Sequence, residues 1–562
     1  MKLFNYLKQL LENPKTLFFY SLFSLMLPSF FLFCTETMTL PVRIAFILIP
    51  LSLYAIVYSV FRKIGVLTLA MLPFMVLGAF QLVLLYLFGE SIIAVDMFLN
   101  LFTTNASEAG ELLSNLWPAV VFVCIMYIPM ITLGIVGVVK HLTLSVRFRK
   151  VVFGIGFVAL LAGLGSAQFA KEFSPKLDIY PINVLYNIYF TKVKWQRSLN
   201  YPQTSEGFEF DAKRTKKVGE REVYFLIIGE ASRATNWSMF GYERETNPRL
   251  SQMPNLVKFR DAITQANVTH KSVPMILSDA SATHHNVLYT HKSVIKAFSE
   301  AGFKTAFISN QVPNRSFIDY FSAQADTLIT MLGDAQITSD SKPDGVLLPV
   351  VDSLLKSTTE DMFIVLHTYG SHYDYRYRYP ADSAYWTPDY VPTISYKYKE
   401  ELVNSYDNSV RYTDYFLSQL MNEINKNSTY SALLYISDHG EDLMDDDRKL
   451  FLHASPKTTY YQLHVPCLVW FSEDYMRTNP TTMQEAIKNE NKPVSTNMVF
   501  HTLLDMANIE TSYKDTTYSI ISDGFKVHPR YYLNDHDKAI EINDLGLKRE
   551  DVLMFEKMQM QY

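Results

Sequence analysis

Three apolar segments in the second half of the chain are followed directly by carboxylate or imidazole side chains. These are Glu230 after Val223–Ile228, His367 and His372 after Met362–Leu366, and Asp438, His439 and Glu441 after Leu433–Ile436. Carboxylates and imidazoles that converge from separate segments suit a borderline cation such as Zn²⁺. A single histidine in a loop is more often an ordinary surface or core residue, so the prediction of a metal site depends on the three segments together.

The nucleophile that would work beside such a cation is not fixed by the residue types. Cys467 lies inside an apolar run, which is typical of a packed thiol rather than a reactive one. The sequence has no Gly-x-Ser-x-Gly elbow and no Walker-type loop. A hydroxyl beside a divalent cation can act as a nucleophile because the cation favours its alkoxide. Four hydroxyls near the first carboxylate stay open as candidates: Ser232, Thr264, Thr269 and Ser272.

These side chains need a scaffold that brings them together. From about residue 216, short apolar runs alternate with amphipathic stretches, which predicts an α/β domain with a largely parallel central sheet. In such sheets, ligands bind outside the carboxyl ends of the strands, where these acidic and histidine residues fall. The expected strands are Val223–Ile228, Thr305–Ile308, Met362–Leu366, Leu433–Ile436 and Cys467–Phe471, and the expected helices include Lys292–Ala301, Lys399–Ile424 and Thr496–Ala507.

The first 170 residues have a different composition from the rest. The chain has 562 residues, 49% of them apolar, and a formal charge of −5, yet residues 1–170 hold only ten Lys/Arg and six Asp/Glu. Such a chain is neither a purely cytosolic enzyme, nor a disordered scaffold, nor a basic nucleic-acid binder. Five apolar runs are long enough, or nearly so, to cross about 30 Å of hydrocarbon. We expect membrane spans at about 16–34, 41–61, 65–88, 117–139 and 151–170.

The loops between these spans predict the orientation of the chain. Nine Lys/Arg lie before the first span or in the second–third and fourth–fifth loops, against one in the alternate loops. This bias places the N-terminus in the cytoplasm, and five crossings place the remainder on the opposite side. Residues 171–200 mix aromatic and cationic side chains, which indicates an interfacial segment, although a plain linker stays open. We expect a transmembrane domain at 1–170, an interfacial helix or linker at 171–215 and an extracytoplasmic domain at 216–562.

Five motifs along the chain occur in the same order in one known family. They are Asn100–Asn105 with Glu108-Ala109, Ile228–Ala234 continuing to Pro248, Thr269–Pro274, Leu366–His372 with Arg378–Pro380, and Ser437–Glu441. They resemble the phosphoethanolamine transferases that modify lipid A, members of the sulfatase and alkaline-phosphatase-like superfamily that include the colistin-resistance enzymes. Five spans followed by a periplasmic domain is also the layout of that family, so the resemblance covers essentially the whole chain.

The resemblance implies roles for particular residues. It implies that one catalytic zinc is held by four residues, Glu230, Thr269, Asp438 and His439, and that Thr269 is the nucleophile. His372 and His453 would contact the transferred phosphate or a second zinc, and would stabilise charge or move protons. Four further positions are implied to bind substrate: Asn100, Thr104, Glu108 and Arg315. The first three recur every four residues and would share one helical face, although an ordinary polar loop stays open. Arg315 stands where the family usually has a lysine, and its planar fork differs in geometry.

The resemblance also implies an activity. We expect a multi-pass protein of the bacterial inner membrane that moves phosphoethanolamine from phosphatidylethanolamine to lipid A or another surface glycan. The transfer would pass through a phosphothreonine-type intermediate, and an ethanolamine cation on the acceptor would weaken the binding of cationic peptides such as polymyxins. The alternatives are a phosphoglycerol transferase on the same fold, often with manganese, and a catalytically inactive membrane-anchored receptor. A sulfatase is disfavoured because the chain has no Cys-x-Pro-x-Arg segment.

Three departures from the family pattern affect the site. The family usually has several disulfides, one beside the nucleophile, whereas Cys467 is the only thiol after residue 170 and Pro274-Met275 stands at that position. We expect packing to hold the catalytic loop instead. The segment Ser371–Asp374 replaces the family's Ser-His-Gly-Pro, and Asp445–Asp447 lengthens the path from His439 to His453.

Overall fold

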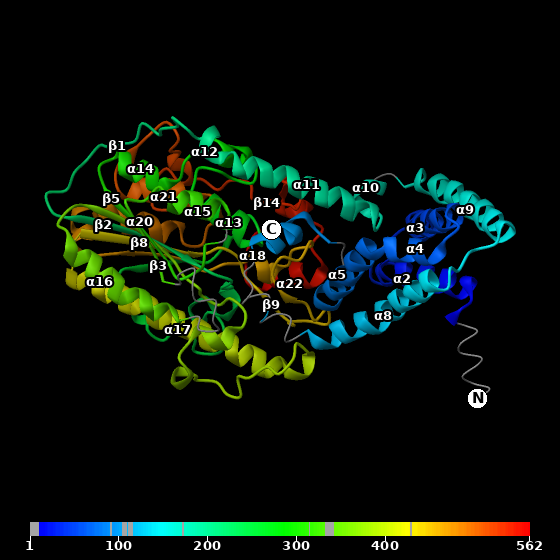
Figure 1. Cartoon of the computed structure of the whole chain (residues 1–562). Coiled ribbons are helices and arrows are strands. Elements are labelled where there is room, and N and C mark those ends of the chain that lie inside the picture. Colours follow the sequence, from blue (N-terminus) through cyan, green and yellow to red (C-terminus); the bar gives the residue numbers. More distant parts are fainter. Residues whose placement is uncertain are drawn as a thin grey trace. The chain divides into compact units, whose positions relative to one another are not determined.

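The chain forms two structural units (Figure 1). The computed structural model describes residues 11–36, 38–89, 93–103, 110, 116–170, 173–313, 315–331, 342–427 and 430–562. One unit consists of residues 1–98 and 116–192, and the other of residues 99–115 and 193–562. The predicted boundaries at 170 and 215 differ from this division and stay predictions.

Long apolar helices make up the first unit. The helices α2 (Pro14–Thr35), α3 (Leu40–Val60), α8 (Trp117–Val139) and α9 (Val146–Ala167) are long and apolar enough to cross a membrane. The span expected at 65–88 is two helices, α4 (Ile64–Ala70) and α5 (Leu72–Phe88), bent by 49°. A proline in the first turn of α5 lacks the N–H that would continue the helix across this point. The described residues therefore contain four spans, or five if the bent pair crosses as one.

Close packing inside this unit depends on small residues. A side chain at Gly65 on α4 would overlap the backbone of Gly137 on α8, so the two helices approach closely where both residues are glycine. Buried hydroxyls bond to one another there: Thr68 Oγ1 lies 3.2 Å from Ser21 Oγ and 3.3 Å from Tyr58 Oη. Polar groups inside a membrane need such partners because lipid supplies none.

The chain up to residue 204 also contains four shorter helices. They are α6 (Val95–Thr103), α10 (Pro175–Asp178), α11 (Ile182–Leu199) and α12 (Tyr201–Thr204). The segment expected to be interfacial is therefore largely helical, and its place at a membrane surface stays a prediction.

A seven-stranded sheet forms the centre of the second unit, in the order β3-β11-β8-β2-β7-β5-β6. Its strands are β2 (Glu222–Gly229), β3 (Leu256–Phe259), β5 (Lys304–Ser309), β6 (Thr327–Thr330), β7 (Met362–His367), β8 (Tyr430–Ser437) and β11 (Cys467–Phe471). The strands β8, β2, β7, β5 and β6 are parallel, and β11 is antiparallel to both of its neighbours. The predicted α/β domain with a mostly parallel sheet is confirmed.

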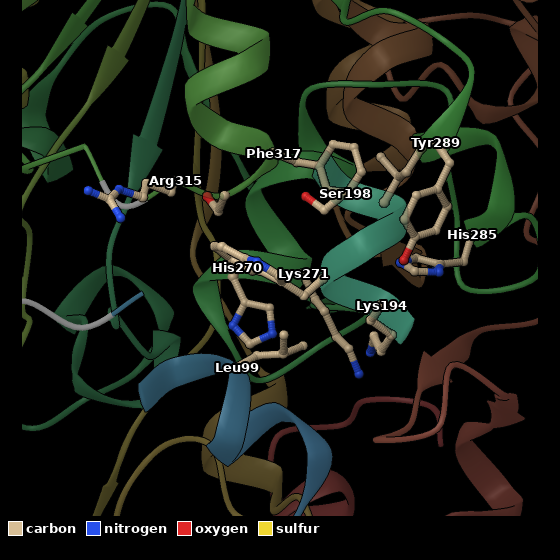
Figure 2. A pocket seen from close by; sticks show the side chains of 12 residues that line it. Leu99, Lys194, Ser198, His270, Lys271, His285, Tyr289, Arg315 and Phe317 are labelled. Carbon is tan, nitrogen blue, oxygen red and sulfur yellow. The ribbon is translucent and has the colours of Figure 1, made fainter. Parts of the chain in front are cut away.

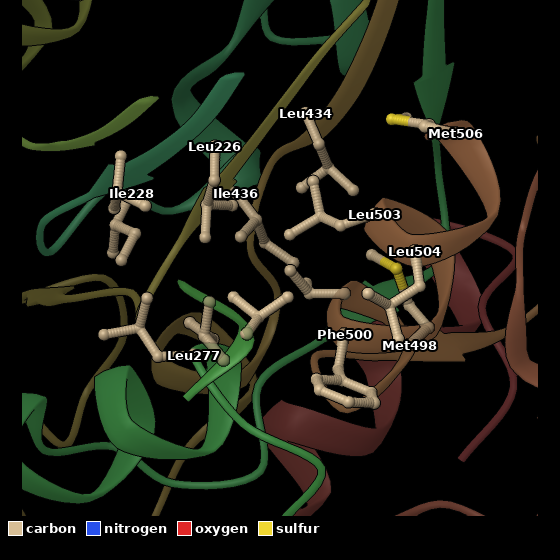
Figure 3. Close-up of a cluster of buried hydrophobic side chains, with 14 of the residues drawn as sticks. Leu226, Ile228, Leu277, Leu434, Ile436, Met498, Phe500, Leu503, Leu504 and Met506 are labelled. Atoms are coloured by element: carbon tan, nitrogen blue, oxygen red, sulfur yellow. The ribbon is translucent and has the colours of Figure 1, made fainter. Parts of the chain in front are cut away.

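Both faces of the sheet are covered, as expected for parallel strands. All eight residues of β2 are buried. On one face, Leu226 and Ile228 belong to the same cluster of buried side chains as Leu503 and Phe500 of α21 (Met498–Met506) (Figure 3). Figure 1 shows α14 (Val294–Glu300) on the same side as α21, with α16 (Leu347–Ser357) and α17 (Lys399–Asn427) on the other. Strand alternation places Val223, Phe225 and Ile227 toward that second side.

Smaller elements surround the sheet. The helices are α13 (Thr269–Ile276), α15 (Phe317–Ser322), α18 (Tyr460–Leu463), α19 (Glu473–Thr478), α20 (Pro480–Asn489) and α22 (Arg549–Lys557). The two-stranded pairs are β1 (Lys213–Arg214) with β13 (Ile509–Glu510), β4 (Ala262–Ile263) with β12 (Val494–Ser495), β9 (Asp442–Leu443) with β10 (Phe451–Leu452), and β14 (Tyr531–Leu533) with β15 (Ala539–Glu541).

The register of the sheet brings the predicted site segments together. Gly229 at the end of β2 pairs with Ser437 at the end of β8, and Ile228 pairs with His367 at the end of β7. Ser309 at the end of β5 pairs with His367 from the other side. The carboxyl ends of four neighbouring parallel strands therefore lie at one edge of the sheet, where α/β proteins bind ligands.

Candidate metal and nucleophile site

Three ligand-type residues meet at this edge of the sheet. Glu230 follows β2, and Asp438 and His439 follow β8. Each offers one ligand atom, and these atoms lie within 4.8 Å of one another. All three residues are fully buried. The geometry therefore brings three of the four predicted metal ligands close enough to share one ion.

Hydrogen bonds fix which atoms of these residues face the centre of the site. His439 Nδ1 lies 3.0 Å from the Gly440 carbonyl oxygen, which can only accept, so Nδ1 carries the proton. The unprotonated Nε2 then points its lone pair toward Glu230 Oε1 at 3.5 Å and Asp438 Oδ2 at 3.2 Å. Asp438 Oδ1 accepts from the backbone N–H groups of Ala231 and His439, whereas Oδ2 receives no hydrogen bond among the described residues.

The electrostatics of this arrangement call for a cation. Burial raises the pKa of Glu230 well above its ordinary value, and the neighbouring Asp438 raises it further. Burial also raises the pKa of Asp438, and it lowers the pKa of His439 well below its ordinary value. Two buried carboxylates that face an imidazole lone pair repel one another unless a positive charge lies between them. Two oxygen donors and one imidazole nitrogen are a donor set that fits Zn²⁺.

Thr269 supplies a hydroxyl at the same point. It is the first residue of α13, and its Oγ1 lies 3.1 Å from His439 Nε2. The same oxygen lies 3.2 Å and 3.4 Å from the two carboxylate oxygens of Glu230. A helix N-terminus favours negative charge, so this position also suits a developing alkoxide.

The other three candidate hydroxyls are committed elsewhere. Thr264 Oγ1 and Ser272 Oγ each donate to the Asp438 carbonyl oxygen at 2.6 Å. Ser232 Oγ accepts from the indole N–H of Trp237 at 2.9 Å. These three side chains hold the backbone around the ligand residues, and Thr269 is the candidate whose hydroxyl faces them.

His372 and His453 lie beside the cluster of Glu230, Asp438 and His439. The ring centre of His453 is 4.1 Å from that of His439, and the ring centre of His372 is 6.2 Å from that of His453. The longer loop through Asp445–Asp447 therefore does not carry His453 away from the site. Burial, together with the nearby Arg378 and His453, lowers the pKa of His372 to about 3. His372 is consequently neutral at pH 7.

The orientation of both imidazoles is set through Nδ1. His372 Nδ1 donates to the Tyr373 carbonyl oxygen at 2.6 Å, and His453 Nδ1 lies 3.2 Å from Glu441 Oε1. In the neutral ring of His372 the proton is therefore on Nδ1, and Nε2 has the lone pair. Glu441 was placed in the ligand-type motif by sequence, and here it orients His453 instead of joining the three-residue cluster.

Gln311 is a site residue that the sequence analysis did not identify. It follows β5, and its Nε2 donates to Glu230 Oε2 at 3.0 Å and to the Thr368 carbonyl oxygen at 2.7 Å. Partners of this kind orient metal ligands. Its position just after an expected strand, Thr305–Ile308, is the signal that could have identified it.

The structure describes two of the four residues that were predicted to bind substrate, Arg315 and Asn100. Arg315 lies just before α15 and lines a pocket with His270 and Lys271, the two residues after Thr269 (Figure 2). Figure 2 also shows the Arg315 guanidinium turned away from Tyr289. Asn100 lies in α6, and Thr104 and Glu108 lie outside the described residues. Substrate binding by these residues stays a prediction.

Hydrogen bonds hold the Thr269 loop where the family pattern has a disulfide. All three cysteines are free, so no disulfide fixes the loop. Asn267 Nδ2 donates to Gln462 Oε1 at 2.6 Å and to the Ser455 carbonyl oxygen at 2.9 Å, and its Oδ1 accepts from Tyr532 Oη at 2.6 Å. This buried side chain, two residues before Thr269, is bonded from three directions.

Comparisons with known proteins agree with this fold. A family model described as Sulfatase matches residues 222–509. The structure of the phosphoethanolamine transferase EptA from Neisseria meningitidis superposes with a TM-score of 0.72 at 20% identity, covering 90% of this chain and 97% of that one. The periplasmic domain of EptC from Escherichia coli in complex with Zn superposes with a TM-score of 0.54 at 26% identity, covering 60% and 97%. The chain therefore belongs to the sulfatase family.

Curated relatives narrow the family. The chain is 30% identical over 399 residues to the phosphoethanolamine transferase EptA of Escherichia coli O157:H7, covering 67% of this chain and 71% of EptA. It is 27% identical over 329 residues to EptC of Escherichia coli O18:K1:H7, covering 57% of this chain and 56% of EptC. It is 30% identical over 285 residues to the Kdo(2)-lipid A phosphoethanolamine 7''-transferase of Escherichia coli K12, covering 49% and 48%. The chain spans about half the length of the last two relatives. Within the sulfatase family, it belongs to the phosphoethanolamine transferases, which are enzymes.

Proposed function

We propose that this chain is a zinc-dependent transferase that moves phosphoethanolamine from phosphatidylethanolamine to lipid A or another surface glycan. The observation that carries the proposal is the position of Thr269 Oγ1, 3.1 Å from His439 Nε2 and 3.2 Å from Glu230 Oε1. The Zn complex of EptC and the names of the curated relatives support the choice of cation and of substrates.

The first half of the reaction would load the enzyme. Zn²⁺ held by Glu230, Asp438, His439 and Thr269 would favour the Thr269 alkoxide and offset negative charge on the phosphate. Thr269 Oγ1 forms a bond to phosphorus while the bond from phosphorus to the diacylglycerol oxygen breaks. The proton that Thr269 gives up ends on that diacylglycerol oxygen. The products are a phosphoethanolamine ester of Thr269 and diacylglycerol, which stays in the bilayer.

The second half of the reaction would transfer the group. A phosphate or hydroxyl oxygen of the acceptor forms a bond to phosphorus, the bond to Thr269 Oγ1 breaks, and Thr269 regains a proton from the acceptor. His372 and His453 are the groups that we assign to proton movement and to charge stabilisation, or to a second Zn²⁺. The Tyr373 carbonyl oxygen orients His372 through its Nδ1, and Glu441 orients His453 through its Nδ1.

The lipid substrates account for the membrane unit. A donor and a leaving group that both remain in the bilayer favour an enzyme anchored there. Arg315 would bind the donor or acceptor phosphate, and Asn100, Thr104 and Glu108 would bind the donor lipid. The charge pattern of the loops supports a bacterial inner-membrane location with the second unit in the periplasm.

Intact mass spectrometry of the full-length protein in detergent micelles tests this function. The protein is loaded with Zn²⁺ and incubated with phosphatidylethanolamine, and in parallel with phosphatidylglycerol. We expect one phosphoethanolamine adduct with the first lipid, none with the Thr269→Ala variant, and a slower adduct with Thr269→Ser, which keeps the hydroxyl. An adduct that persists in Thr269→Ala, or one that forms only from phosphatidylglycerol, would contradict the proposal.

A further inference from the structure

The acidic segment Asp445–Asp447, which lengthens the path from His439 to His453, lies in the turn between β9 and β10. These two strands pair in antiparallel register and form a hairpin. Glu441 directly precedes β9, and His453 directly follows β10. The open end of the hairpin therefore carries both members of the contact between Glu441 and His453, so the position of the hairpin decides where this imidazole lies.

A buried arginine holds the acidic segment. Arg233 follows Glu230 by three residues and is 4% exposed. Its Nη1 and Nη2 donate to Asp445 Oδ2 and Oδ1 at 2.7 Å and 2.8 Å, which makes a bidentate ion pair. Asp445 Oδ2 also accepts from the backbone N–H of Leu443 at 2.9 Å, which ties the carboxylate to β9. Two parallel bonds fix direction as well as distance, so the pair holds the hairpin in one position against the segment after β2.

The same guanidinium reaches the residue that orients His453. Arg233 Nη1 donates to the Glu441 carbonyl oxygen at 3.0 Å, and Glu441 Oε1 lies 3.2 Å from His453 Nδ1. Arg233 Nε donates to Asn236 Oδ1 at 2.6 Å, and the guanidinium carbon lies 4.8 Å from the ring centre of Tyr461. Each nitrogen of the guanidinium therefore has a partner, and one partner is the backbone of the residue that contacts the imidazole.

A second arginine holds the turn of the hairpin from another direction. Arg448 Nη2 donates to Asp446 Oδ2 at 2.7 Å. The two terminal nitrogens of Arg448 also donate to the Asp551 carboxylate of α22 at 2.7 Å and 2.9 Å. Asp447, by contrast, is exposed. Like charges in a row repel one another, and here two of the three carboxylates are paired with arginine. The residues that lengthen the hairpin therefore also fasten it.

The position of His453 shows the effect of these contacts. Its ring centre lies 4.1 Å from that of His439, although the whole hairpin separates the two residues in the chain. Beyond it, the backbone N–H of Ala454 donates to the Asn267 carbonyl oxygen at 3.1 Å. A hairpin with strands of two residues has little stability of its own in water, so side-chain contacts must hold it.

We propose that Arg233 and Asp445 are positioning residues of the transfer reaction. They hold Glu441 and, through it, keep the imidazole of His453 against His439. The inference rests on the proposed function, which assigns His453 to proton movement and charge stabilisation or to a second Zn²⁺, and it adds the ion pair that keeps this side chain in place. Neither positioning residue needs to touch the substrate, because a group that is displaced by about 1 Å already loses much of its effect on a reaction rate.

Chemical modification of histidine tests the positioning without any lipid. The full-length, Zn²⁺-loaded protein in micelles is treated with diethyl pyrocarbonate, and modification of His453 is followed by peptide mass spectrometry. Asp445→Asn removes one acceptor oxygen of the ion pair, so His453 should react several times faster than in the wild type. Asp447→Asn removes the same charge at an exposed position and should leave the reaction rate of His453 unchanged. His501 on α21, which is also partly exposed, is the internal reference and should react equally in all three proteins.

An unchanged rate at His453 in Asp445→Asn would overturn the inference, and so would an equal increase at His501, which would show a general loosening of the fold. Arg233→Lys is the second variant if Asp445→Asn does not fold. It keeps the positive charge but cannot form two parallel bonds, so it should raise the reactivity of His453 in the same direction.

A double-mutant cycle tests the consequence for catalysis. Transfer from phosphatidylethanolamine to lipid A is measured in the wild type, Asp445→Asn, His453→Ala and the double variant. We expect Asp445→Asn to lower kcat by at least about tenfold with little change in KM, the effect of a lost orienting partner. In the His453→Ala background the same change should lower kcat by less than about twofold, because the side chain that it positions is gone. Equal losses in both backgrounds would overturn the inference.

The two measurements separate this inference from the proposed function. If the wild type transfers no group from phosphatidylethanolamine, the proposed function fails. The reactivity of His453 in Asp445→Asn and Asp447→Asn then still decides whether the ion pair positions this imidazole.

Discussion

Hydrogen-bond partners distinguish a nucleophile from a structural hydroxyl in this site. The sequence left Ser232, Thr264, Thr269 and Ser272 open, because all four are hydroxyls near one carboxylate. In the fold, three of them bond to backbone or indole groups, and Thr269 faces Glu230 and His439. Residue types alone could not predict this difference, because it depends on which way each side chain points.

The residue that holds Thr269 in place was also beyond sequence reasoning. Asn267 is a generic polar residue in the sequence, and its three buried hydrogen bonds come from segments about 190 to 265 residues away. The prediction that packing would replace the missing disulfide did not include this buried amide. Long-range partners of this kind leave no local pattern in the sequence.

Asn267→Ala should both slow the reaction and weaken the fold. Loss of a buried, fully bonded amide costs about 1–3 kcal/mol of stability. A displaced nucleophile costs roughly 100-fold in rate. The measurements are the rate of adduct formation on Thr269 and the thermal unfolding of the protein in micelles.

Tyr532→Phe is the matched control for this variant. It removes one donor to Asn267 Oδ1 and leaves the two bonds from Nδ2, so its effect on the rate should be smaller. A normal adduct rate in Asn267→Ala, together with a lowered unfolding temperature, would mean that Asn267 has only a structural role.

At the scale of elements, the ends of the strands assemble the site. The five expected strands all occur, and the expectation that ligands lie at their carboxyl ends led to Glu230, Asp438 and His439, which the structure brings together. The two edge strands β3 and β6 were not predicted, because each has only four residues and is partly exposed. The break between α4 and α5 was missed because hydropathy averages over a proline that interrupts a helix.

Gly370 permits the turn after β7 to approach the metal-type residues. Its φ of +50° is in the left-handed region, and a Cβ there would lie 2.5 Å from the Glu230 carbonyl oxygen and 2.7 Å from its nitrogen. Gly370→Ala should therefore displace Glu230 and lower both the zinc content of the purified protein and the rate of adduct formation by at least about tenfold, the effect of a misplaced ligand or orienting partner.

The Gly546→Ala variant is the control that separates the overlap with Glu230 from the effect of backbone strain. Gly546 also has a positive φ, +67°, but nothing lies within 4 Å of its Cβ position. Both variants should lose about 1–2 kcal/mol to the left-handed backbone, and only Gly370→Ala should lose metal. Equal zinc content in the two proteins, measured by elemental analysis, would show that the close approach to Glu230 is unimportant.

At the scale of the whole molecule, the two parts of the chain differ in amino-acid composition, and this difference is visible in the sequence. The first 170 positions hold only ten Lys/Arg and six Asp/Glu, which predicts the membrane unit. Nine of these ten cations lie before the first span or in alternate loops, which predicts its orientation. The apolar helices of that unit confirm a membrane protein, whereas the sidedness depends on charges in loops and is a separate question. Composition could not place the boundary between the units, because α11 continues through it.

Cysteine labelling tests the orientation. Cys34 and Cys124 are exposed and are replaced by alanine, while Cys467 is fully buried and burial raises the pKa of its thiol, so it stays unreactive. In cells with a permeabilised outer membrane, an impermeant maleimide should label Lys526→Cys, an exposed position of the second unit, and should spare Arg62→Cys, between α3 and α4. Labelling of Arg62→Cys before lysis would reverse the orientation.

The absence of any cystine in the catalytic unit has a consequence for where and when the enzyme can mature. Its fold closes without a thiol oxidase, a disulfide isomerase or oxygen, since packing and polar contacts secure the nucleophile loop. A cell that lives without air, or that lacks thiol-oxidising machinery in its envelope, could assemble this catalyst as readily as an aerobic one, and reducing agents should leave it active.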